Sequence, residues 1–254
     1  MSPAPVALIT GAAQRIGRTL ALDLAEHGWS IGIHYNSSRD AAERLASDLR
    51  AKNTAAAILP ADLADPTAVE QLVVDCARAL SPPVCLINNA SMFAYDDVAT
   101  LASDLWDAQI AVNLKAPVFL AKAFAAMLPD GKEGNVINIV DQRVWKPTPR
   151  FFSYALAKSA LWDATRTLAQ ALAPRVRVNA IAPGPALRSV HQSEEEFRRQ
   201  YEATILGRGT TPQEIARAVR FILDAPAMTG QMIALDGGQH LAWETPDVKT
   251  APRG

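Results

Sequence analysis

Two residues near the middle of the chain, Tyr154 and Lys158, have the types and the spacing of a proton-transfer pair. Side chains four residues apart lie on the same face of a helix, so the phenol and the ammonium are expected to be neighbours. A nearby ammonium favours the ionised form of a phenol, which makes the phenol a usable general acid or base nearer neutral pH. The alternative is a surface tyrosine and a surface lysine on an amphipathic helix. The elements around the pair have to decide between the two.

A glycine loop near the N-terminus predicts a dinucleotide-binding site. The apolar run 6–9 has the composition of a buried strand, and apolar residues at helical spacing follow from position 20. Between them, Gly11 permits a tight turn and Gly17, after Ile16, permits close packing of the helix on the sheet. The helix N-terminus would receive the pyrophosphate. Arg15 stands where a middle glycine is common, and it is either a phosphate ligand or a solvated charge at the helix start.

The end of the second predicted strand, 29–35, favours NADP(H). The residues there are His34, Tyr35, Asn36, Ser37, Ser38 and Arg39. A carboxylate at this point would accept the ribose 2′-hydroxyls, whereas hydroxyls and an arginine suit a 2′-phosphate. The first carboxylate, Asp40, comes only after them. Ser37 or Ser38 could also cap the predicted helix 40–52, and both roles can hold at once.

The fold class follows from the alternation of short apolar runs with helical patterns. The predicted strands are 6–9, 29–35, 55–61, 84–87, 135–140, 176–181 and 232–235. This pattern indicates one α/β domain over residues 1–244, a Rossmann-type doubly wound parallel sheet of about seven strands with helices on both faces. Ligands bind at the carboxyl ends of such strands. Those ends are followed by Gly11, Ser37, Asp62, Leu63, Asn88, Asn89, Ala90, Ser91, Asp141, Pro183 and Gly184.

Two segments stand apart from this alternation. The polar stretch 186–209 is interpreted as a substrate lid, with Ser193 capping a helix that starts with three glutamates. A plain surface helix is the alternative. Residues 245–254 have little to bury, so a loose C-terminal tail is expected there.

Composition excludes several classes of protein. The net charge is -1, and both signs are mixed without the basic stripe that a nucleic-acid binder needs. No apolar run approaches the roughly 20 residues of a membrane span. The two cysteines, Cys76 and Cys85, suit packed thiols in a reducing compartment, and the four scattered histidines argue against a metal site. A cytoplasmic protein without nucleic-acid or membrane partners is expected.

Taken together, the motifs resemble the short-chain dehydrogenase/reductase family over nearly the whole chain. The matching residues, in the family's order, are Thr10-Gly11 with Gly17, Asp62-Leu63, Asn88-Asn89-Ala90, Asn113, Tyr154 with Lys158, Pro183-Gly184 and Asp236-Gly237-Gly238. The resemblance implies that Tyr154 exchanges a proton with the substrate, that Lys158 binds the nicotinamide ribose and lowers the pKa of Tyr154, and that Asn113 holds a water in a proton relay. It also implies a homodimer or homotetramer.

Asp141 departs from that family pattern. Thirteen residues before the tyrosine the family usually has a serine, which donates to a substrate carbonyl. An ionised carboxylate donates no hydrogen bond and would repel a developing alkoxide, whereas a carboxylic acid can hand a proton to a ring nitrogen. The same replacement occurs in the pteridine reductases, a branch of the family.

Further residues resemble this branch. They are Arg15, Ser91, Phe93, and the pair His34-Tyr35 ahead of Ser37 and Ser38. The resemblance implies that Phe93 stacks a pterin against the nicotinamide, and that Arg15 and Ser91 contact cofactor phosphate or pterin. Ordinary core packing is the alternative for Phe93. The branch can carry a basic residue where this chain has Ser37, and the residues of the predicted lid do not match.

The sequence therefore predicts an NADPH-dependent reductase that acts on a C=N bond of a small pterin-like molecule: a pterin, a dihydropterin or dihydrofolate. Tyr154, with Asp141 and water, would supply the proton. One alternative is a carbonyl reductase of the same family, acting on a 3-oxoacyl thioester or a sugar. An alternative of another class is a non-catalytic, NADPH-binding regulatory protein.

Overall fold

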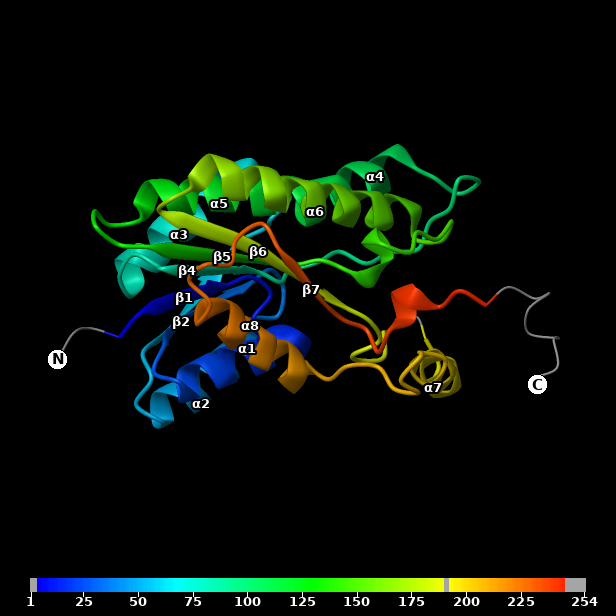
Figure 1. The fold of residues 1–254 in the computed structure, drawn as a ribbon. Helices are drawn as coiled ribbons and strands as arrows, with labels where there is room; N and C mark the ends of the chain where they lie inside the picture. Colours follow the sequence, from blue (N-terminus) through cyan, green and yellow to red (C-terminus); the bar gives the residue numbers. More distant parts are fainter. Residues whose placement is uncertain (1–3, 190–191, 245–254) are drawn as a thin grey trace.

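A seven-stranded parallel sheet forms the centre of the protein in a computed structural model that describes residues 4–189 and 192–244. The strand order is β3-β2-β1-β4-β5-β6-β7 (Figure 1). The strands are β1 (Val6–Ile9), β2 (Ser30–Tyr35), β3 (Ala56–Pro60), β4 (Cys85–Asn88), β5 (Gly134–Ile139), β6 (Val176–Pro183) and β7 (Met232–Leu235). This architecture confirms the predicted doubly wound fold. The predicted tail, 245–254, and residues 190–191 of the predicted lid lie outside the described residues.

Helices cover both faces of the sheet. In Figure 1, α1, α2 and α8 lie below the sheet, and α3, α4, α5 and α6 lie above it. The helices are α1 (Arg15–Glu26), α2 (Arg39–Ala51), α3 (Pro66–Ala79), α4 (Ser103–Ile110), α5 (Ala116–Met127), α6 (Phe152–Leu172), α7 (Glu194–Glu202) and α8 (Pro212–Leu223), with single turns η1 (Ala111–Lys115), η2 (Gln142–Val144) and η3 (Gln239–Leu241).

The hydrophobic core consists of apolar strand residues that pack against the helices on both faces of the sheet. All four residues of β1 are buried, and successive side chains point to opposite faces. Ile9 packs with the lower helices, and Leu8 packs with the upper ones. A strand that is covered on both faces needs a continuous apolar run, which is the pattern by which the sequence identified it.

The helical stretch Ser103–Met127 is continuous but not uniform. Its middle turn, η1, is a π-helix in which the N–H of Ala116 donates to the carbonyl of Ala111, five residues earlier. Pro117 lacks an N–H, so an interruption is expected beside it. The π turn contains the buried Asn113. Such turns occur frequently at functional sites.

By length and composition alone, the stretch Ser103–Met127 could also cross a membrane, with a mean hydropathy of 1.4. It is longer and more apolar than the sequence analysis allowed for any segment. A core helix of a soluble protein meets the same criterion, and Leu120 and Phe124 of this helix are fully buried in the cluster that contains Leu86 of β4.

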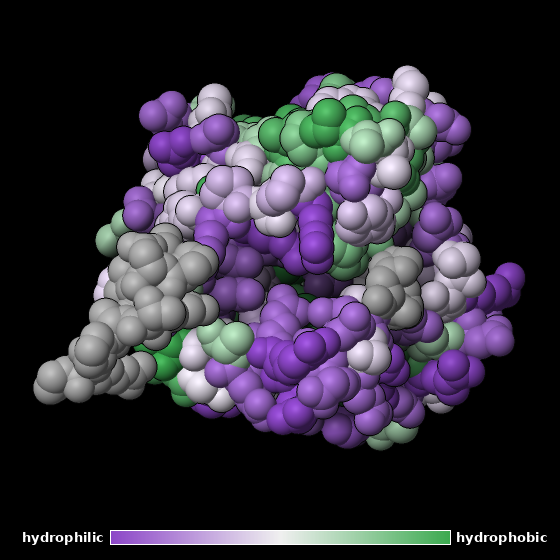
Figure 2. Space-filling model, turned by 90° about the vertical axis from the view of Figure 1, so that its right-hand side faces the viewer, coloured by the Kyte–Doolittle hydropathy of each residue, from purple (hydrophilic) through white to green (hydrophobic). Residues whose placement is uncertain are grey.

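The sheet order reverses between β1 and β4, and a hollow opens at the carboxyl ends of these strands. Figure 2 shows this hollow on the face that carries α7, with hydrophilic residues around it. The cap of α7 agrees with its sequence, because Ser193 and Glu196 form the reciprocal bonds of a capping box. For the second helix, Ser38 occupies the N-cap position of α2, as the capping alternative requires, but its side chain makes no capping bond.

His34 of β2 ties the first three strands together beneath the hollow. Its Nδ1 accepts a hydrogen bond from the N–H of Gly11 at 3.0 Å, and its Nε2 lies 3.1 Å from the carbonyl of Ala61. Since Nδ1 accepts, Nε2 must carry the proton and donate. Burial lowers the pKa of His34 from 6.5 to about 4, so the neutral ring is the folded form at neutral pH.

This burial predicts an acid-sensitive stability. As the pH falls from about 6.5 towards 4, the unfolded chain takes up a proton on residue 34 before the folded protein does, so the free energy of unfolding decreases, by up to about 3 kcal/mol. Urea unfolding of the wild type and of His34→Gln between pH 7 and pH 4.5 measures this effect. The wild type should lose more stability over this range than the variant. Equal losses would contradict the assignment.

Candidate active site

A cleft of about 1380 Å³ occupies the hollow at the carboxyl ends of the strands. Nearly all of the predicted site residues line it: Gly11, Arg15, Ile16, Gly17, His34, Tyr35, Asn36, Ser37, Ser38, Asp62, Leu63, Asn89, Ala90, Ser91, Phe93, Asp141, Tyr154, Lys158, Pro183 and Gly184. Asn113 does not line the cleft and lies behind it. From the predicted lid, α7 contributes Glu196, Phe197 and Arg199 to the lining. The segment thus contains a helix that borders the cleft, and its role as a substrate lid stays a prediction.

The glycine loop is too close-packed to accept side chains at two positions. Gly11 has a φ of +62°, which favours glycine. A Cβ at Gly17 would lie 2.2 Å from the carbonyl oxygen of Gly11 and 2.7 Å from Asn89 Nδ2. Asn89 donates from that nitrogen to the carbonyl of Thr10 at 2.9 Å and so ties the loop to the end of β4.

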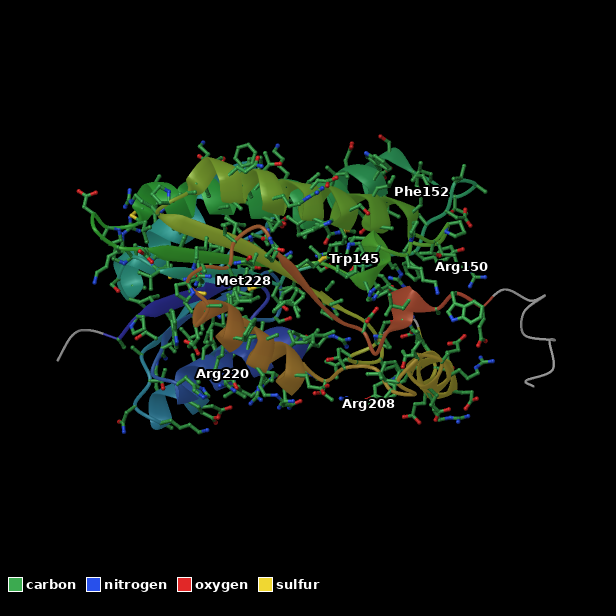
Figure 3. The ribbon with its side chains drawn as sticks, viewed as in Figure 1. Trp145, Arg150, Phe152, Arg208, Arg220 and Met228 are labelled. Carbon is green, nitrogen blue, oxygen red and sulfur yellow. The ribbon has the colours of Figure 1, made fainter. Side chains whose placement is uncertain are left out.

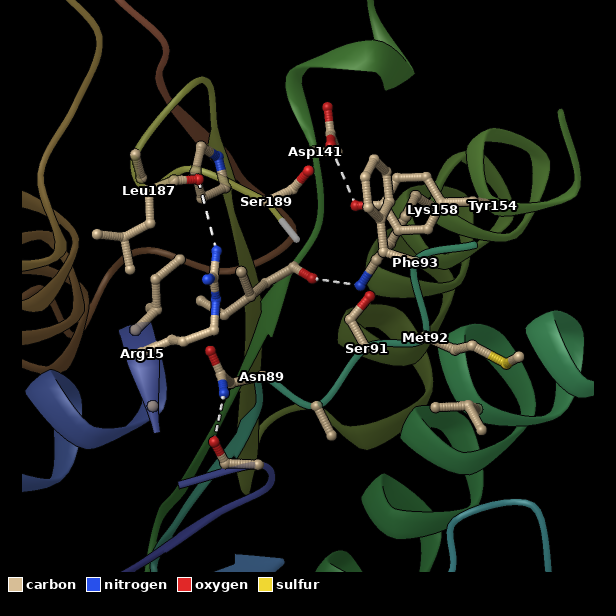
Figure 4. Close-up of a pocket in the computed structure, with 18 of the residues that line it drawn as sticks. Arg15, Asn89, Ser91, Met92, Phe93, Asp141, Tyr154, Lys158, Leu187 and Ser189 are labelled. Atoms are coloured by element: carbon tan, nitrogen blue, oxygen red, sulfur yellow. Dashed lines mark hydrogen bonds between the residues drawn. The ribbon is translucent and has the colours of Figure 1, made fainter. Parts of the chain in front are cut away.

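Arg15 adopts a left-handed φ of 53°, which an L-residue with a side chain rarely adopts. Its guanidinium extends across the cleft and donates to the carbonyl of Arg188 at 3.0 Å and to that of Leu187 at 3.5 Å (Figure 4). The predicted phosphate or pterin contact of Arg15 stays a prediction. In this structure, Arg15 connects the glycine loop to Leu187 and Arg188, at the start of the predicted lid.

Asn113 fixes the loop that follows β4. Its Oδ1 accepts from Ser91 Oγ at 2.9 Å and from the N–H of Met92 at 3.1 Å, while its Nδ2 donates to the carbonyl of Met92 at 2.9 Å and to Gln109 Oε1 at 3.1 Å. The side chain is fully buried. The predicted role of Asn113 in a water relay stays a prediction, and its observed contacts hold Ser91 at the cleft.

A buried carboxylate caps the helix that carries Tyr154. Both oxygens of Asp96 lie 3.2 Å from the N–H of Ser153, and Ser153 Oγ donates to Asp96 Oδ2 at 2.5 Å. A negative charge is stabilised at a helix N-terminus. Asp96 therefore links the loop after β4 to the first turn of α6, directly before Tyr154.

The structure brings Asp141, Tyr154 and Lys158 together. The Tyr154 hydroxyl donates to Asp141 Oδ2 at 3.0 Å, and Lys158 Nζ donates to the carbonyl of Ile139 at 2.8 Å (Figure 4). Tyr154 and Lys158 are buried, so neither belongs to a solvated helix face. Asp141 is the N-cap residue of η2, two residues after the end of β5, and Tyr154 stands in the first turn of α6.

The electrostatics of the pair differ from the prediction. Burial, together with the nearby negative charge of Asp141, raises the pKa of Tyr154 well above 10, while Arg143 lowers it. Burial also lowers the pKa of Lys158 from 10.5 to about 8, against the effect of Asp141. Burial and Asp141 thus raise the pKa of Tyr154 here, and the role of Lys158 in lowering that pKa stays a prediction. Desolvation and a carboxylate in hydrogen-bond contact outweigh an ammonium that lies 5.9 Å from the ring centroid.

Aromatic rings form one wall of the cleft beside this pair. Phe93 stacks on Phe151 with 4.2 Å between centroids and an angle of 11°, and it meets Tyr154 in a T-shaped contact at 4.8 Å. Sequence reasoning missed Phe151 and Arg143, whose guanidinium lies over both phenylalanine rings. Phe151 lies just before the Ser153-Tyr154 pair and Arg143 lies two residues after Asp141, so their nearness to the chemistry was the available signal.

The residues of the cleft fit a nicotinamide dinucleotide. The loop of Gly11 and Gly17 brings backbone close to the cleft, as a pyrophosphate requires. Ser37, Ser38 and Asn36 line the end of β2, where the 2′-phosphate would lie, and the side chain of Ser38 has no capping role. Lys158 lies at the inner end, where the nicotinamide ribose would be held. Among the described residues, no group of three or more His, Cys, Asp or Glu side chains could hold a metal ion.

Known proteins that are similar in sequence identify the family. The family model described as enoyl-(acyl carrier protein) reductase matches residues 11–240. A short-chain type dehydrogenase/reductase of Picea abies is 31% identical over an aligned length of 248 residues, and the alignment covers 92% of this chain and 92% of that one. A 3-oxoacyl-[acyl-carrier-protein] reductase of Synechocystis sp. is 32% identical over 240 residues, 92% of this chain and 96% of that one. The chain belongs to the short-chain dehydrogenase/reductase family.

Two solved structures are similar along almost the whole chain. The FolM alternative dihydrofolate reductase 1 from Brucella suis, in complex with NADP, is 49% identical, with a TM-score of 0.90 over 96% of this chain and 98% of that one. The corresponding structure from Brucella canis, complexed with NADP, is also 49% identical, with a TM-score of 0.91 over 96% and 97% of the two chains. These likenesses confirm the predicted pteridine reductase-like branch and the class of oxidoreductase.

Gly17→Ala tests the glycine loop. The added Cβ would collide with the carbonyl oxygen of Gly11, so the loop must move and NADPH binding should weaken by at least about tenfold. Fluorescence titration with NADPH measures the dissociation constant. Gly28→Ala is the matched control, because Gly28 has a positive φ of 84° but nothing within 4 Å of an added Cβ. It should lose stability and keep the affinity, and equal affinity losses in both variants would contradict the loop's role.

Proposed function

We propose that the protein is an NADPH-dependent reductase of a C=N bond in a dihydropterin-like substrate, including dihydrofolate. The hydrogen bond from the Tyr154 hydroxyl to the Asp141 carboxylate is the observation that carries this proposal. It places an anion beside the group that exchanges the proton. The two Brucella enzymes named as alternative dihydrofolate reductases support the same substrate class, at 49% identity.

NADP(H) is the cofactor. Asn36, Ser37 and Ser38 line the cleft at the end of β2, and these neutral groups do not repel a 2′-phosphate. NADP is present in both Brucella structures. When bound, NADPH supplies a hydride to the carbon of the C=N bond.

The carboxylate of Asp141 decides which double bond suits the site. Reduction of a carbonyl builds negative charge on oxygen, and an anion next to that oxygen opposes it. A ring imine is reduced most easily with a proton on its nitrogen, and this positive charge is stabilised by a neighbouring carboxylate. Asp141 therefore favours the imine over the carbonyl.

Tyr154 is arranged to give the proton. Because its pKa is raised well above 10, the hydroxyl stays protonated at neutral pH. Donation to the ring nitrogen would leave a phenolate beside Asp141, so the tyrosine must regain a proton promptly. The side chain of Asp141 is 18% exposed, so water can reach the pair and replace the proton. The balance is one hydride to carbon and one proton to nitrogen.

Phe93 and Phe151 support a flat, aromatic substrate. Their stacked rings form an apolar wall beside Tyr154, and a pteridine ring would gain on the order of 1 kcal/mol from stacking beyond the burial of its area. Phe151 already covers one face of the Phe93 ring, so the substrate would contact a surface of these two rings other than the faces that stack on each other. Arg15 and Ser91 remain proposed contacts of the pterin or of cofactor phosphate.

Reduction of a 3-oxoacyl thioester is the second candidate. The relative from Synechocystis sp. is named for that activity and is 32% identical. A non-catalytic NADPH-binding protein is a weaker candidate, because the Asp141–Tyr154 pair lies buried in the cleft with Lys158 beside it.

Substitution of Asp141 by serine separates the two reductase activities. The wild type should oxidise NADPH with dihydrobiopterin or dihydrofolate. Asp141→Ser should lower this turnover about a hundredfold, because the ring nitrogen loses its anionic neighbour, while turnover of acetoacetyl thioester should stay equal or rise. Tyr154→Phe is the control and should lower both activities. A wild type that turns over only the thioester would end the pterin proposal.

We also propose a cytoplasmic homodimer or homotetramer. The helical stretch Ser103–Met127 supports assembly, since only 33% of its most apolar window is buried within one chain. Partly buried apolar side chains of this stretch, such as Leu114 and Phe119, would become covered in an assembly. Light scattering on the purified protein should give the mass of two or four chains. Substitution of the exposed Leu101 by lysine should shift that mass downwards if the contact uses this end of the helix, and a monomeric wild type would refute the proposal.

A further inference from the structure

Arg143 contacts the carboxylate of the proton-donating pair through two of its groups. Its main-chain N–H donates to Asp141 Oδ1 at 2.9 Å, and its Nη1 lies 3.5 Å from Asp141 Oδ2. Oδ2 is also the atom that accepts the Tyr154 hydroxyl at 3.0 Å. Both oxygens of the carboxylate are therefore held by one residue, and the oxygen that faces Tyr154 has a cation beside it.

The guanidinium is itself held by the aromatic wall. Its central carbon lies 5.4 Å from the centroid of Phe93 and 5.2 Å from that of Phe151. A cation within about 6 Å of an aromatic ring is attracted by the negative face of the ring. The Arg143 side chain is 18% exposed, so these contacts are largely shielded from water. The rings thus fix the guanidinium, and the guanidinium fixes the carboxylate.

The other charged group near Asp141 is engaged elsewhere. Lys158 Nζ, on α6, donates to the carbonyl of Ile139 at 2.8 Å. A partly buried carboxylate needs a partner that offsets its lost hydration. Among the described residues, Arg143 is the cation that forms an ion pair with Asp141.

We propose that Arg143 is a positioning residue that keeps the Asp141 carboxylate turned towards the Tyr154 hydroxyl. This proposal rests on the proposed function in one respect, that the Asp141–Tyr154 pair supplies the proton. It adds that Arg143 connects Phe93 and Phe151 to Asp141, so that a shift of these rings would also move the carboxylate. A neutral side chain at position 143 would remove the cation beside Oδ2 and leave only the main-chain N–H on Oδ1 to oppose rotation of the carboxylate away from Tyr154.

A double-mutant cycle between positions 143 and 141 tests this proposal. Arg143→Met keeps an unbranched side chain against the rings and removes the charge, so kcat should fall about tenfold while the KM for NADPH changes less than about twofold. In an Asp141→Asn background the same substitution should lower kcat less than about twofold, since no carboxylate remains to be held. Equal losses in the two backgrounds would overturn the proposal.

A conservative variant distinguishes positioning by charge from plain packing. Arg143→Lys retains a cation near Asp141 and should recover kcat to within about threefold of the wild type. If Arg143→Lys is as slow as Arg143→Met, the charge has no role and the proposal fails. Should Arg143→Met lower the melting temperature by more than about 5 °C, the neutral Arg143→Gln takes its place in the cycle.

The chain offers a matched control on the outer face of α6. Arg166 also lies over an aromatic ring, 5.2 Å from the centroid of Trp162, and it forms an ion pair with a carboxylate, Asp163. It lies outside the cleft, so Arg166→Met should keep the wild-type kcat. The cycle uses whichever substrate the wild type reduces. A wild type that accepts only thioesters therefore refutes the proposed function alone, and an additive cycle refutes the role of Arg143 alone.

Discussion

The hydrogen bond between Tyr154 and Asp141 is the contact on which the geometry of the active site depends. It joins the end of β5 to the first turn of α6, two elements whose side chains have to meet within 3.0 Å. Both ends are held from outside: Asp96 caps α6 directly before Tyr154, and the N–H of Arg143 holds Asp141. The surrounding loops are therefore ordered by bonds that converge on one proton-exchanging pair.

The loop after β4 is likewise held by hydrogen bonds to several other elements. Thr10 Oγ1 accepts from the N–H groups of Asn89 and Ala90, Asn113 holds Met92, and Gln109 Nε2 donates to the carbonyl of Ala94. With Asp96 at the far end, each successive part of this loop is bonded to a different element. A loop that is bonded in this way places Ser91 and Phe93 as reproducibly as a strand would. On the other side of the cleft, Arg15 joins the glycine loop to Arg188, at the start of the predicted lid.

How much of this could be predicted depended on the kind of signal. Buried strands such as Val6–Ile9 and the glycine loop have patterns that are local in sequence, so the parallel sheet and its ligand-binding edge were predictable. The carboxylate at Asp141 was recognisable because it replaces a familiar serine at a fixed distance from Tyr154. The contacts of Arg143 and Phe151 were not, since they depend on how η2 and the start of α6 fold against Phe93. The burial that raises the pKa of Tyr154 was not predictable for the same reason, because spacing shows neighbours but not burial.

The π turn at Ala111–Lys115 changes the direction in which side chains point along the helical stretch Ser103–Met127, so that α4 and α5 have different apolar faces. One extra residue in a turn rotates everything after it by about 100° relative to a regular α-helix. The side chains of α4 and those of α5 therefore obey separate apolar registers, and Asn113 stands at the point where one changes into the other. Deletion of a single residue there would make the helix more regular and would turn either Asn113 away from Met92 or Phe124 away from the sheet. A regular α-helix in this stretch is therefore incompatible with the bonds by which Asn113 holds the loop after β4.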